Sequence, residues 1–317
     1  MTWQAARVAQ VREEAVGIRS LELVPAGGSD FAPFAPGAHV ELQLGPSLIR
    51  PYSLVNTVGW DGTYRVAVKL EPTSRGGSRR VHELREGEEI AVRPPRNNFP
   101  LDPGAKHHLL LAGGIGITPI LGMARHLAAS GGSFELGYFG RSRSEMAFLD
   151  ELSGASLRAR TALHVGLEPP AVRDVLADML ARQPRGTHVY VCGPSPFMTL
   201  ARELVAGHPD LALHLEYFSN DAAMPDQQAD GFRVVLGRSG RSFEIPPDRT
   251  IVEVLAENGI VVPTSCEQGV CGTCQTGVIS GRPEHRDLFL SDEEHAAGDT
   301  MLICVSRSLD RELVLDL

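Results

Sequence analysis

Four of the five cysteines in this 317-residue chain lie close to its end, and their spacing is the clearest chemical signal in the sequence. Intervals of four, two and 29 residues separate Cys266, Cys271, Cys274 and Cys304. Three thiolates on one short loop with a distant fourth form the ligand pattern of a plant-type [2Fe–2S] cluster. On the residues alone two alternatives stay open: a zinc ion held by all four thiolates, and buried cysteines that bind nothing.

The residues between these cysteines favour the iron–sulfur interpretation. Gly269 and Gly272 permit a loop whose backbone N–H groups turn toward bridging sulfides, where such hydrogen bonds help to set the reduction potential. The segment 263–274, PTSCEQGVCGTC, resembles the cluster loop of plant-type ferredoxins. That resemblance implies a β-grasp fold, to which a predicted hairpin over 232–245 and a helix opened by the capping box at 250–253 are similar.

A glycine-rich turn, AGGIGITP over 112–119, follows an apolar run at 108–112 and opens a predicted helix at 119–130. Glycines let the backbone approach a pyrophosphate, and the N-terminus of a helix stabilises its charge. The pattern is not G-x-G-x-x-G, so a turn that only packs is the alternative. A second apolar run, 187–192, ends in the sequence Cys-Gly-Pro, where a lone cysteine is commonly a small core residue.

Two short motifs in the first hundred residues could hold a flavin. In the sequence RPYS at 50–53, the tyrosine ring can stack on an isoalloxazine, the serine hydroxyl can reach its polar edge, and the arginine can neutralise a phosphate. Gly76, Gly77 and Ser78 stand before a predicted helix at 79–84, which makes Ser78 its expected N-cap and the loop a phosphate cradle. Taken singly, the first motif could be surface residues and the second a solvated basic loop.

The elements around these motifs predict a multidomain protein. Short alternating runs joined by turns predict an antiparallel β-barrel flavin domain at 1–103. The repeating order of apolar run, turn and helix predicts a Rossmann-like α/β nucleotide domain at 104–220. The polar segment 221–230 is the expected linker, and 231–317 is the expected β-grasp ferredoxin domain.

The order of flavin domain, nicotinamide domain and C-terminal ferredoxin resembles the phthalate dioxygenase reductase and vanillate demethylase reductase family over essentially the whole chain. The resemblance implies FMN as the flavin and NADH as the electron donor, with NADPH left open. It also implies that Cys192, Thr118 and Glu216 position the reacting groups, although Glu216 could instead be a surface residue that closes a strand. The cofactor-binding residues expected from these motifs are Arg50, Tyr52, Ser53, Gly76, Gly77, Ser78, Gly113, Gly114, Gly116, Thr118, Pro119, Arg141, Arg143, Cys192, Gly193 and Pro194.

Arg141 and Arg143 are included because they stand where an acidic, ribose-binding residue would be expected after the second strand of the nucleotide domain. Arginine at this place can pair with a 2′-phosphate or lie along an adenine ring. The two side chains therefore bear on the choice between NADPH and NADH, which the sequence leaves open.

These sites together predict an electron relay. A nicotinamide gives up two electrons as a hydride, a [2Fe–2S] cluster accepts one at a time, and a flavin can do both. By resemblance, the chain is a reductase that supplies a Rieske-type non-haem iron oxygenase in aromatic catabolism, and that oxygenase acts on an aromatic acid or a methyl ether. A three-domain electron carrier can work alone, so a monomer is expected. The alternatives are a reductase for a P450 or another monooxygenase, and a redox sensor without sustained turnover.

Composition excludes some classes of function. The chain has 30 basic and 39 acidic residues, a net charge of −9, and lacks the basic surplus that nucleic-acid binding needs. Neither a targeting peptide nor a membrane span is recognisable, so a cytoplasmic location is expected. The region 231–317 carries 8 arginines against 14 acidic residues, a net charge of −6, which predicts an acidic face for a basic partner unless it serves solubility alone.

Overall fold

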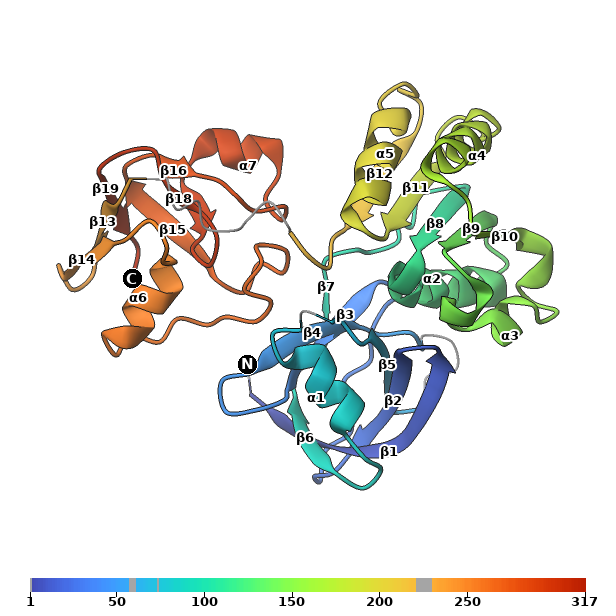
Figure 1. The fold of residues 1–317 in the computed structure, drawn as a ribbon, viewed down its shortest axis with the longest axis horizontal. Helices are drawn as coiled ribbons and strands as arrows, with labels where there is room; N and C mark the ends of the chain where they lie inside the picture. The colour runs from blue at the N-terminus through green and yellow to red at the C-terminus, as the bar shows by residue number, and fades with distance from the viewer. Residues whose placement is uncertain (1, 57–60, 73, 221–229) are drawn as a thin grey trace. The chain divides into compact units, whose positions relative to one another are not determined.

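The computed structural model of the chain describes residues 2–56, 61–72, 74–220 and 230–317. It divides into two compact units, Met1–Glu216 and Tyr217–Leu317 (Figure 1). The expected domain boundaries after 103 and 220 stay predictions. The expected linker, 221–230, lies outside the described residues except for Asp230.

An antiparallel sheet of seven strands forms the N-terminal part of the first unit, with strand order β4-β3-β6-β1-β2-β5 and β7 paired to β3. Just beyond β4, Leu54 forms a bridge with Val66 in β5, which brings the two edges of the sheet together as in a barrel. The elements are β1 (Gln4–Ala15), β2 (Ile18–Pro25), β3 (Ala38–Gln43), β4 (Ile49–Ser53), β5 (Tyr64–Lys69), α1 (Gly77–Glu83), β6 (Glu89–Val92) and β7 (Arg96–Asn97).

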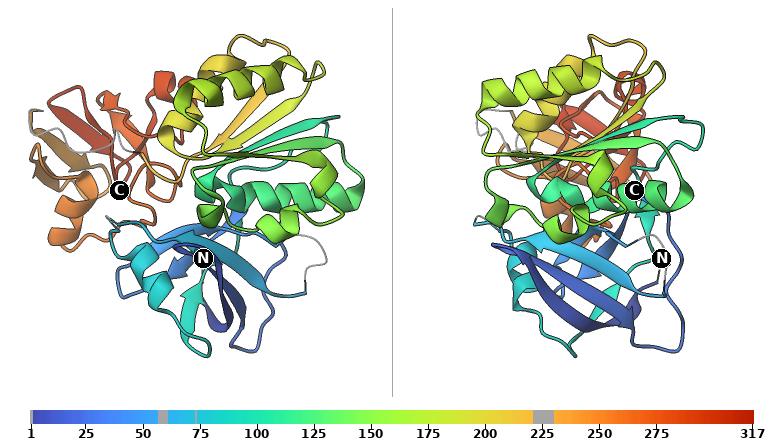
Figure 2. Two further views of the ribbon diagram at one scale, coloured as in Figure 1. Left: turned by 45° about the vertical axis from the view of Figure 1, so that its right-hand side comes forward. Right: turned by 90° about the vertical axis from the view of Figure 1, so that its right-hand side faces the viewer.

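The rest of the first unit is a parallel sheet of five strands with order β10-β9-β8-β11-β12. All six residues of β8 are buried, as expected for a central strand covered on both faces. Helices α4 and α5 cover one face, and α2 and α3 lie on the other (Figure 2). The elements are β8 (His108–Gly113), η1 (Gly114–Gly116), α2 (Ile117–Ser130), β9 (Phe134–Gly140), η2 (Arg143–Glu145), α3 (Leu149–Leu152), η3 (Arg158–Arg160), β10 (Thr161–Val165), α4 (Pro169–Ala181), β11 (His188–Cys192), α5 (Ser195–Val205) and β12 (Ala212–Glu216).

One hydrophobic core joins the barrel to the parallel sheet, because Ile18 and Val55 of the barrel belong to the same buried cluster as Leu110 and Tyr190 of the sheet. Arg125 on α2 reinforces this junction. Its guanidinium donates hydrogen bonds to both carboxylate oxygens of Glu151, at 2.5 Å each, and to the carbonyl of Val55. The motifs of the barrel and of the nucleotide sheet are therefore held in a fixed relation.

The second unit has a five-stranded sheet with order β14-β13-β19-β15-β17 and a small pair, β16-β18. The expected hairpin and the expected capping box are both present, since β13 pairs with β14 and Thr250 and Glu253 cap α6 reciprocally. The elements are β13 (Phe232–Leu236), β14 (Ser242–Ile245), α6 (Ile251–Glu257), β15 (Gln275–Ser280), β16 (Pro283–Glu284), α7 (Asp292–Ala297), β17 (Thr300–Leu302), β18 (Arg307–Ser308) and β19 (Glu312–Leu315). The expected fold class of flavin-type antiparallel sheet, parallel nucleotide sheet and ferredoxin domain is confirmed.

One local expectation was wrong. The helix predicted at 79–84 is α1 and begins at Gly77, so Ser78 lies inside its first turn and is not its N-cap. Gly76 occupies the cap position with a φ of 94°, a left-handed conformation that suits glycine, and the hydroxyl of Ser78 instead accepts a hydrogen bond from the backbone N–H of Glu71 at 3.1 Å. Among the described helices, none has both the length and the apolar character needed to cross a membrane.

Candidate metal centre and nucleotide site

The four clustered cysteines are all buried and converge from one loop and one distant position in the second unit. Hydrogen bonds between thiols join Cys266 to Cys271 and Cys274 to Cys304, and the Cys266 and Cys304 sulfurs also interact electrostatically. The thiols thus form two neighbouring pairs. Two pairs suit a two-iron cluster, in which each iron takes two cysteine ligands.

The zinc alternative fits this arrangement poorly. Zinc–sulfur bonds of about 2.3 Å would bring four tetrahedral thiolates to about 3.8 Å from one another. Within the described ranges, three potential ligand atoms lie within 4.8 Å of one another in a single group, and that group contains no cysteine. The pairing of the thiols therefore supports the two-iron interpretation that the sequence favours.

Both glycines of the cysteine loop are required by conformation and by packing. Gly269 and Gly272 have φ values of 69° and 74°, which L-residues with side chains rarely adopt. A Cβ atom on Gly272 would lie 2.3 Å from the ring of Phe289, and one on Gly269 would lie 3.1 Å from the Cα of Asp287. The loop is therefore pressed against the segment that precedes α7.

The glycine-rich turn and the Cys-Gly-Pro turn lie side by side, because they follow the adjacent parallel strands β8 and β11. A Cβ atom on Gly116 would lie 2.1 Å from the carbonyl oxygen of Cys192, and one on Gly113 would lie 2.9 Å from Pro194. The hydroxyl of Thr118, which is buried, donates to the carbonyl of Ile115 at 3.1 Å and so stabilises the turn itself. The two turns form one crevice wall at the carboxyl ends of the strands, where open α/β sheets bind ligands.

Glu216 joins this crevice to the flavin motif. It is the register partner of Cys192 across β11 and β12, and its carboxyl accepts a hydrogen bond from the hydroxyl of Ser53 in the barrel. Its other oxygen, Oε2, is buried and has no hydrogen-bond partner among the described atoms. Glu216 does close its strand and is partly exposed as a whole, but a buried polar atom without a partner is typical of a ligand site.

Burial determines the protonation states of Glu216 and Cys192. It raises the pKa of Glu216 from 4.5 to about 8, although the hydrogen bond from Ser53 opposes the shift. Burial, followed by the charge of Glu216, raises the pKa of the Cys192 thiol well above its ordinary value. At neutral pH the two groups are therefore a carboxylic acid and a thiol, which places no net charge beside a bound ring.

The raised pKa of Glu216 makes the stability of the first unit depend on pH. Between about pH 5 and 7.5 the folded protein retains a proton that the unfolded chain has lost, so this group makes the free energy of unfolding fall by ~1.4 kcal/mol per pH unit as pH rises. Glu216→Gln is neutral throughout and is expected to lose that slope. The measurement is the thermal midpoint of the unit across this range, with Glu83→Gln, an exposed residue of α1, as control. Equal slopes in wild type and Glu216→Gln would contradict the assignment.

The two flavin motifs are also brought together. A Cβ atom on Gly77 would lie 2.7 Å from Cγ of Arg50 and 3.1 Å from the phenol oxygen of Tyr52, so glycine at this position lets the RPYS strand pack closely against the start of α1. Burial raises the pKa of Tyr52, which keeps its phenol neutral. The residues of 76–78 and 50–53 thus border one cradle at the N-terminus of α1, with Ser53 turned toward Glu216.

Arg141 and Arg143 follow β9 and are exposed. Because β9 lies next to β8, both arginines stand one strand away from the glycine-rich turn, at the same edge of the sheet. Their assignment to the nucleotide, like the roles of the other site residues, stays a prediction.

Comparisons with known proteins bear on these observations. Residues 234–309 match the family model described as a 2Fe-2S iron-sulfur cluster binding domain. Residues 88–209 match the model of the N-terminal domain of dimethylamine monooxygenase subunit DmmA-like proteins. Vanillate O-demethylase oxidoreductase from Pseudomonas sp. strain HR199 is 44% identical over 315 residues, which cover 98% of each chain.

Two solved structures extend the comparison. Phthalate dioxygenase reductase, whose structure is described as modular for electron transfer from pyridine nucleotides to [2Fe-2S], is 39% identical with a TM-score of 0.78 over 99% of this chain and 98% of that one. An intact type IV self-sufficient cytochrome P450 monooxygenase is 37% identical with a TM-score of 0.84 over 99% of this chain, but the match covers 41% of the P450 chain.

The residues of this chain fit the cofactors that such proteins imply. The buried thiols suit a cluster, the paired motifs of the flavin site and of the nucleotide site pack against each other, and Glu216 has a buried oxygen without a partner. The expected cofactor set of FMN, a [2Fe–2S] cluster and NADH is likewise confirmed. The chain therefore belongs to the phthalate dioxygenase reductase and vanillate demethylase reductase family, as an NAD(P)H-dependent flavin and iron–sulfur oxidoreductase that serves an oxygenase.

Proposed function

We propose that this reductase supplies electrons to a separate Rieske-type non-haem iron oxygenase that demethylates or dioxygenates an aromatic acid or aryl methyl ether. The observation that carries the proposal is that one chain holds the flavin cradle, the nucleotide crevice and the paired cysteines, in the same order and over the same length as vanillate O-demethylase oxidoreductase. The proposal includes action as a monomer. The cytoplasmic location stays a prediction.

At the flavin site, the residues of this chain would bind the cofactor and fix its orientation. A bound FMN supplies the ability to take two electrons together and to release them singly. Arg50 and the N-terminus of α1 offer positive charge and N–H donors to its phosphate, while Tyr52 offers a ring face and Ser53 a hydroxyl. Gly77 lets Arg50 and Tyr52 pack closely against the start of α1, as the contacts of a Cβ atom at this position indicate.

At the nucleotide, the glycine-rich turn offers its backbone to the pyrophosphate of NADH, and the start of α2, with Pro119 in its first turn, contributes a favourable dipole. Cys192, Gly193 and Pro194 form the wall on which the nicotinamide lies. The carboxylic acid of Glu216, held by Ser53, reaches both cofactor sites and fixes their relation without adding charge. Thr118 acts through the shape of the turn.

The exposed arginines after β9 give a test of donor choice. If Arg143 pairs with a 2′-phosphate, Arg143→Asp is expected to lower kcat/KM for NADPH relative to NADH by roughly 10- to 100-fold, since a hydrogen bond to a charged group contributes about 1.5–3 kcal/mol. The measurement is the ratio of the two kcat/KM values by flavin reduction. Arg158→Asp, an exposed charge reversal in η3 before β10, is the control. An unchanged ratio in Arg143→Asp would refute the contact.

The partner is tested by reconstitution. The holoprotein is mixed with the oxygenase component of a vanillate O-demethylase, NADH and vanillate, and the demethylated phenol is measured against the NADH oxidised. Product formed in proportion to NADH, and falling as salt is added, is expected because the acidic domain steers a basic partner. NADH oxidation without product, with this and with other Rieske oxygenases, would contradict the proposal.

A second candidate is a reductase for a P450, and a specific observation favours it. The reductase part of a self-sufficient P450 superposes on the whole of this chain with a TM-score of 0.84. In that protein the match covers 41% of a longer chain, whereas this chain equals the length of the separate oxygenase reductases. Rapid reduction of a P450 haem, with no turnover of any Rieske oxygenase, would make this second candidate the function.

A further inference from the structure

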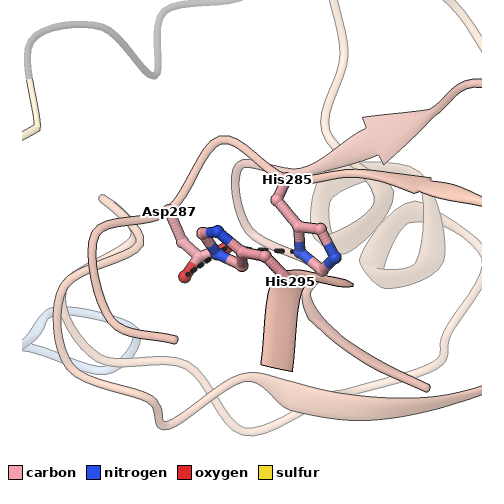
Figure 3. Close-up of side chains that lie close together, drawn as sticks. All are labelled: His285, Asp287 and His295. Carbon is pink, nitrogen blue, oxygen red and sulfur yellow. Dashed lines mark hydrogen bonds and ion pairs between the residues drawn. The ribbon is translucent and has the colours of Figure 1, made fainter. Parts of the chain in front are cut away.

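Three side chains outside the cysteine loop converge in the second unit. His285 follows β16, Asp287 lies two residues farther along, and His295 projects from α7 (Figure 3). Nδ1 of His285 lies 3.7 Å, and Nε2 of His295 lies 3.3 Å, from Oδ1 of Asp287. The three ligand atoms all lie within 4.8 Å of one another.

The carboxylate of Asp287 is fully buried, and polar groups of the protein contact both of its oxygens. Oδ2 accepts hydrogen bonds from the backbone N–H groups of Phe289 and Leu290, at 3.1 and 2.8 Å. Nε2 of His295 lies 3.3 Å from both oxygens, whereas Nδ1 of His285 and the hydroxyl of Ser306 approach Oδ1, at 3.7 and 3.5 Å. Within the described ranges, the ion pairs of Asp287 are with histidines, so the compensating cation must be a protonated imidazole or a bound ion.

His285 is the unexplained member of the group. Its side chain is 10% exposed, and its ring nitrogens form no hydrogen bond of normal length with a described atom, since Nδ1 lies 3.7 Å from Oδ1 of Asp287 and only the backbone of His295 is also near. A buried polar atom without a partner is costly unless it binds something. A neutral imidazole carries a lone pair on one ring nitrogen, which is the group that binds a metal ion.

The distances match those of a tetrahedral metal site. Zinc binds histidine nitrogen and carboxylate oxygen at about 2.0–2.2 Å, which places neighbouring ligand atoms at about 3.3–3.6 Å. The two nitrogen–oxygen distances, 3.3 and 3.7 Å, are close to these edges. The imidazoles are stacked with centroids 4.3 Å apart, so a metal requires one ring to turn, and His295, at 28% exposed, has the space to do so.

We propose that His285, Asp287 and His295 bind a divalent transition-metal ion of the zinc class, with a fourth position open to water or an external ligand. Two imidazoles and one carboxylate are borderline ligands that suit Zn²⁺ better than Mg²⁺ or Ca²⁺, which prefer oxygen ligands alone. The site uses none of the four clustered cysteines and does not depend on the function proposed above.

The proposed metal site lies against the cysteine loop, so a bound ion would affect the stability of this region. The backbone N–H of Leu288 donates to the carbonyl of Gly269 at 3.0 Å, and Asp287 packs against that glycine. A metal ion would therefore link α7 to the segment on which the loop of Cys266 and Cys271 rests. Zinc is expected to raise the thermal midpoint of the second unit, since an ion that binds only the folded state stabilises it.

The test uses tag-free holoprotein, treated with a mild chelator and then dialysed against micromolar Zn²⁺, with zinc and iron per chain measured by atomic emission. Wild type is expected to retain one zinc ion without loss of iron. His295→Gln and His285→Gln are both expected to lose zinc binding and to keep their iron, and His126→Gln, an exposed residue of α2, is the matched control. His295→Gln alters a partly exposed side chain, so it remains informative if His285→Gln fails to fold.

X-ray absorption at the zinc edge identifies the ligands. A shell of nitrogen and oxygen at about 2.0 Å supports the site, whereas a shell of sulfur at about 2.3 Å would mean that zinc has entered the cysteine loop. Three results would overturn the proposal: no retained zinc, zinc that persists in both histidine variants, or zinc that enters only as iron leaves.

Discussion

Cys271→Ser is expected to lose NADH-dependent reduction of cytochrome c by roughly 100-fold or more while keeping NADH-dependent reduction of ferricyanide, because a [2Fe–2S] cluster needs all four thiolates. Cys271 lies between its partner thiol, Cys266, and a hydroxyl contact to Thr273 at 3.4 Å, so a serine there removes a ligand from a buried pair. The first unit contains the whole nucleotide crevice and flavin cradle and should work unchanged.

The measurement pairs both assays with iron content and the visible spectrum of the same sample. Loss of both activities with the flavin still bound would argue against the serial order of flavin and cluster. Retention of cytochrome c reduction without iron would show that the flavin alone serves this acceptor. A redox sensor, the third alternative, would give slow cytochrome c reduction in the wild type as well.

Much of this site could be predicted because its motifs are local. The spacing of the cysteines, the capping box of α6 and the glycine-rich turn each depend on residues close together in the chain, and each element is found within a residue or two of its expected place. The exception is the cap of α1, where a glycine with positive φ at position 76 stands in place of the serine cap that the pattern favoured.

The contacts that the sequence could not give are between distant segments. Ser53 contacts Glu216, which lies 163 positions later in the chain. Arg125 binds both Glu151 and the backbone carbonyl of Val55. A single arginine in an apolar helix belongs to no recognisable motif, so this contact could not be predicted. The same holds for His285, Asp287 and His295, whose meeting depends on how α7 folds back. Such pairs follow from sheet order and core packing, which no local pattern encodes.

Gly116→Ala is expected to raise the KM for NADH by about 10- to 100-fold, since forcing one methyl group into a filled space costs about 1–3 kcal/mol. The backbone of Gly116, with a φ of −60°, suits alanine, so steric contact alone decides the effect. A Cβ atom there would lie 2.1 Å from the carbonyl oxygen of Cys192 and 2.8 Å from the nitrogen of Gly193. The three nearest atoms all belong to the peptide group that joins Cys192 to Gly193, and backbone cannot move aside as a flexible side chain can, so the two turns must separate.

A series of glycine substitutions makes the prediction quantitative. Gly113→Ala, whose Cβ would lie 2.9 Å from the side chain of Pro194, should have a smaller effect, and Gly28→Ala, with nothing within 4 Å, should have none. Stopped-flow reduction of the flavin by NADH gives each KM, and iron content confirms that the second unit is intact. Gly116→Ala should lower the reduction of both ferricyanide and cytochrome c, whereas Cys271→Ser should lower the reduction of cytochrome c alone. Equal KM values for the three variants would mean that the contact between the two turns does not shape the nucleotide site.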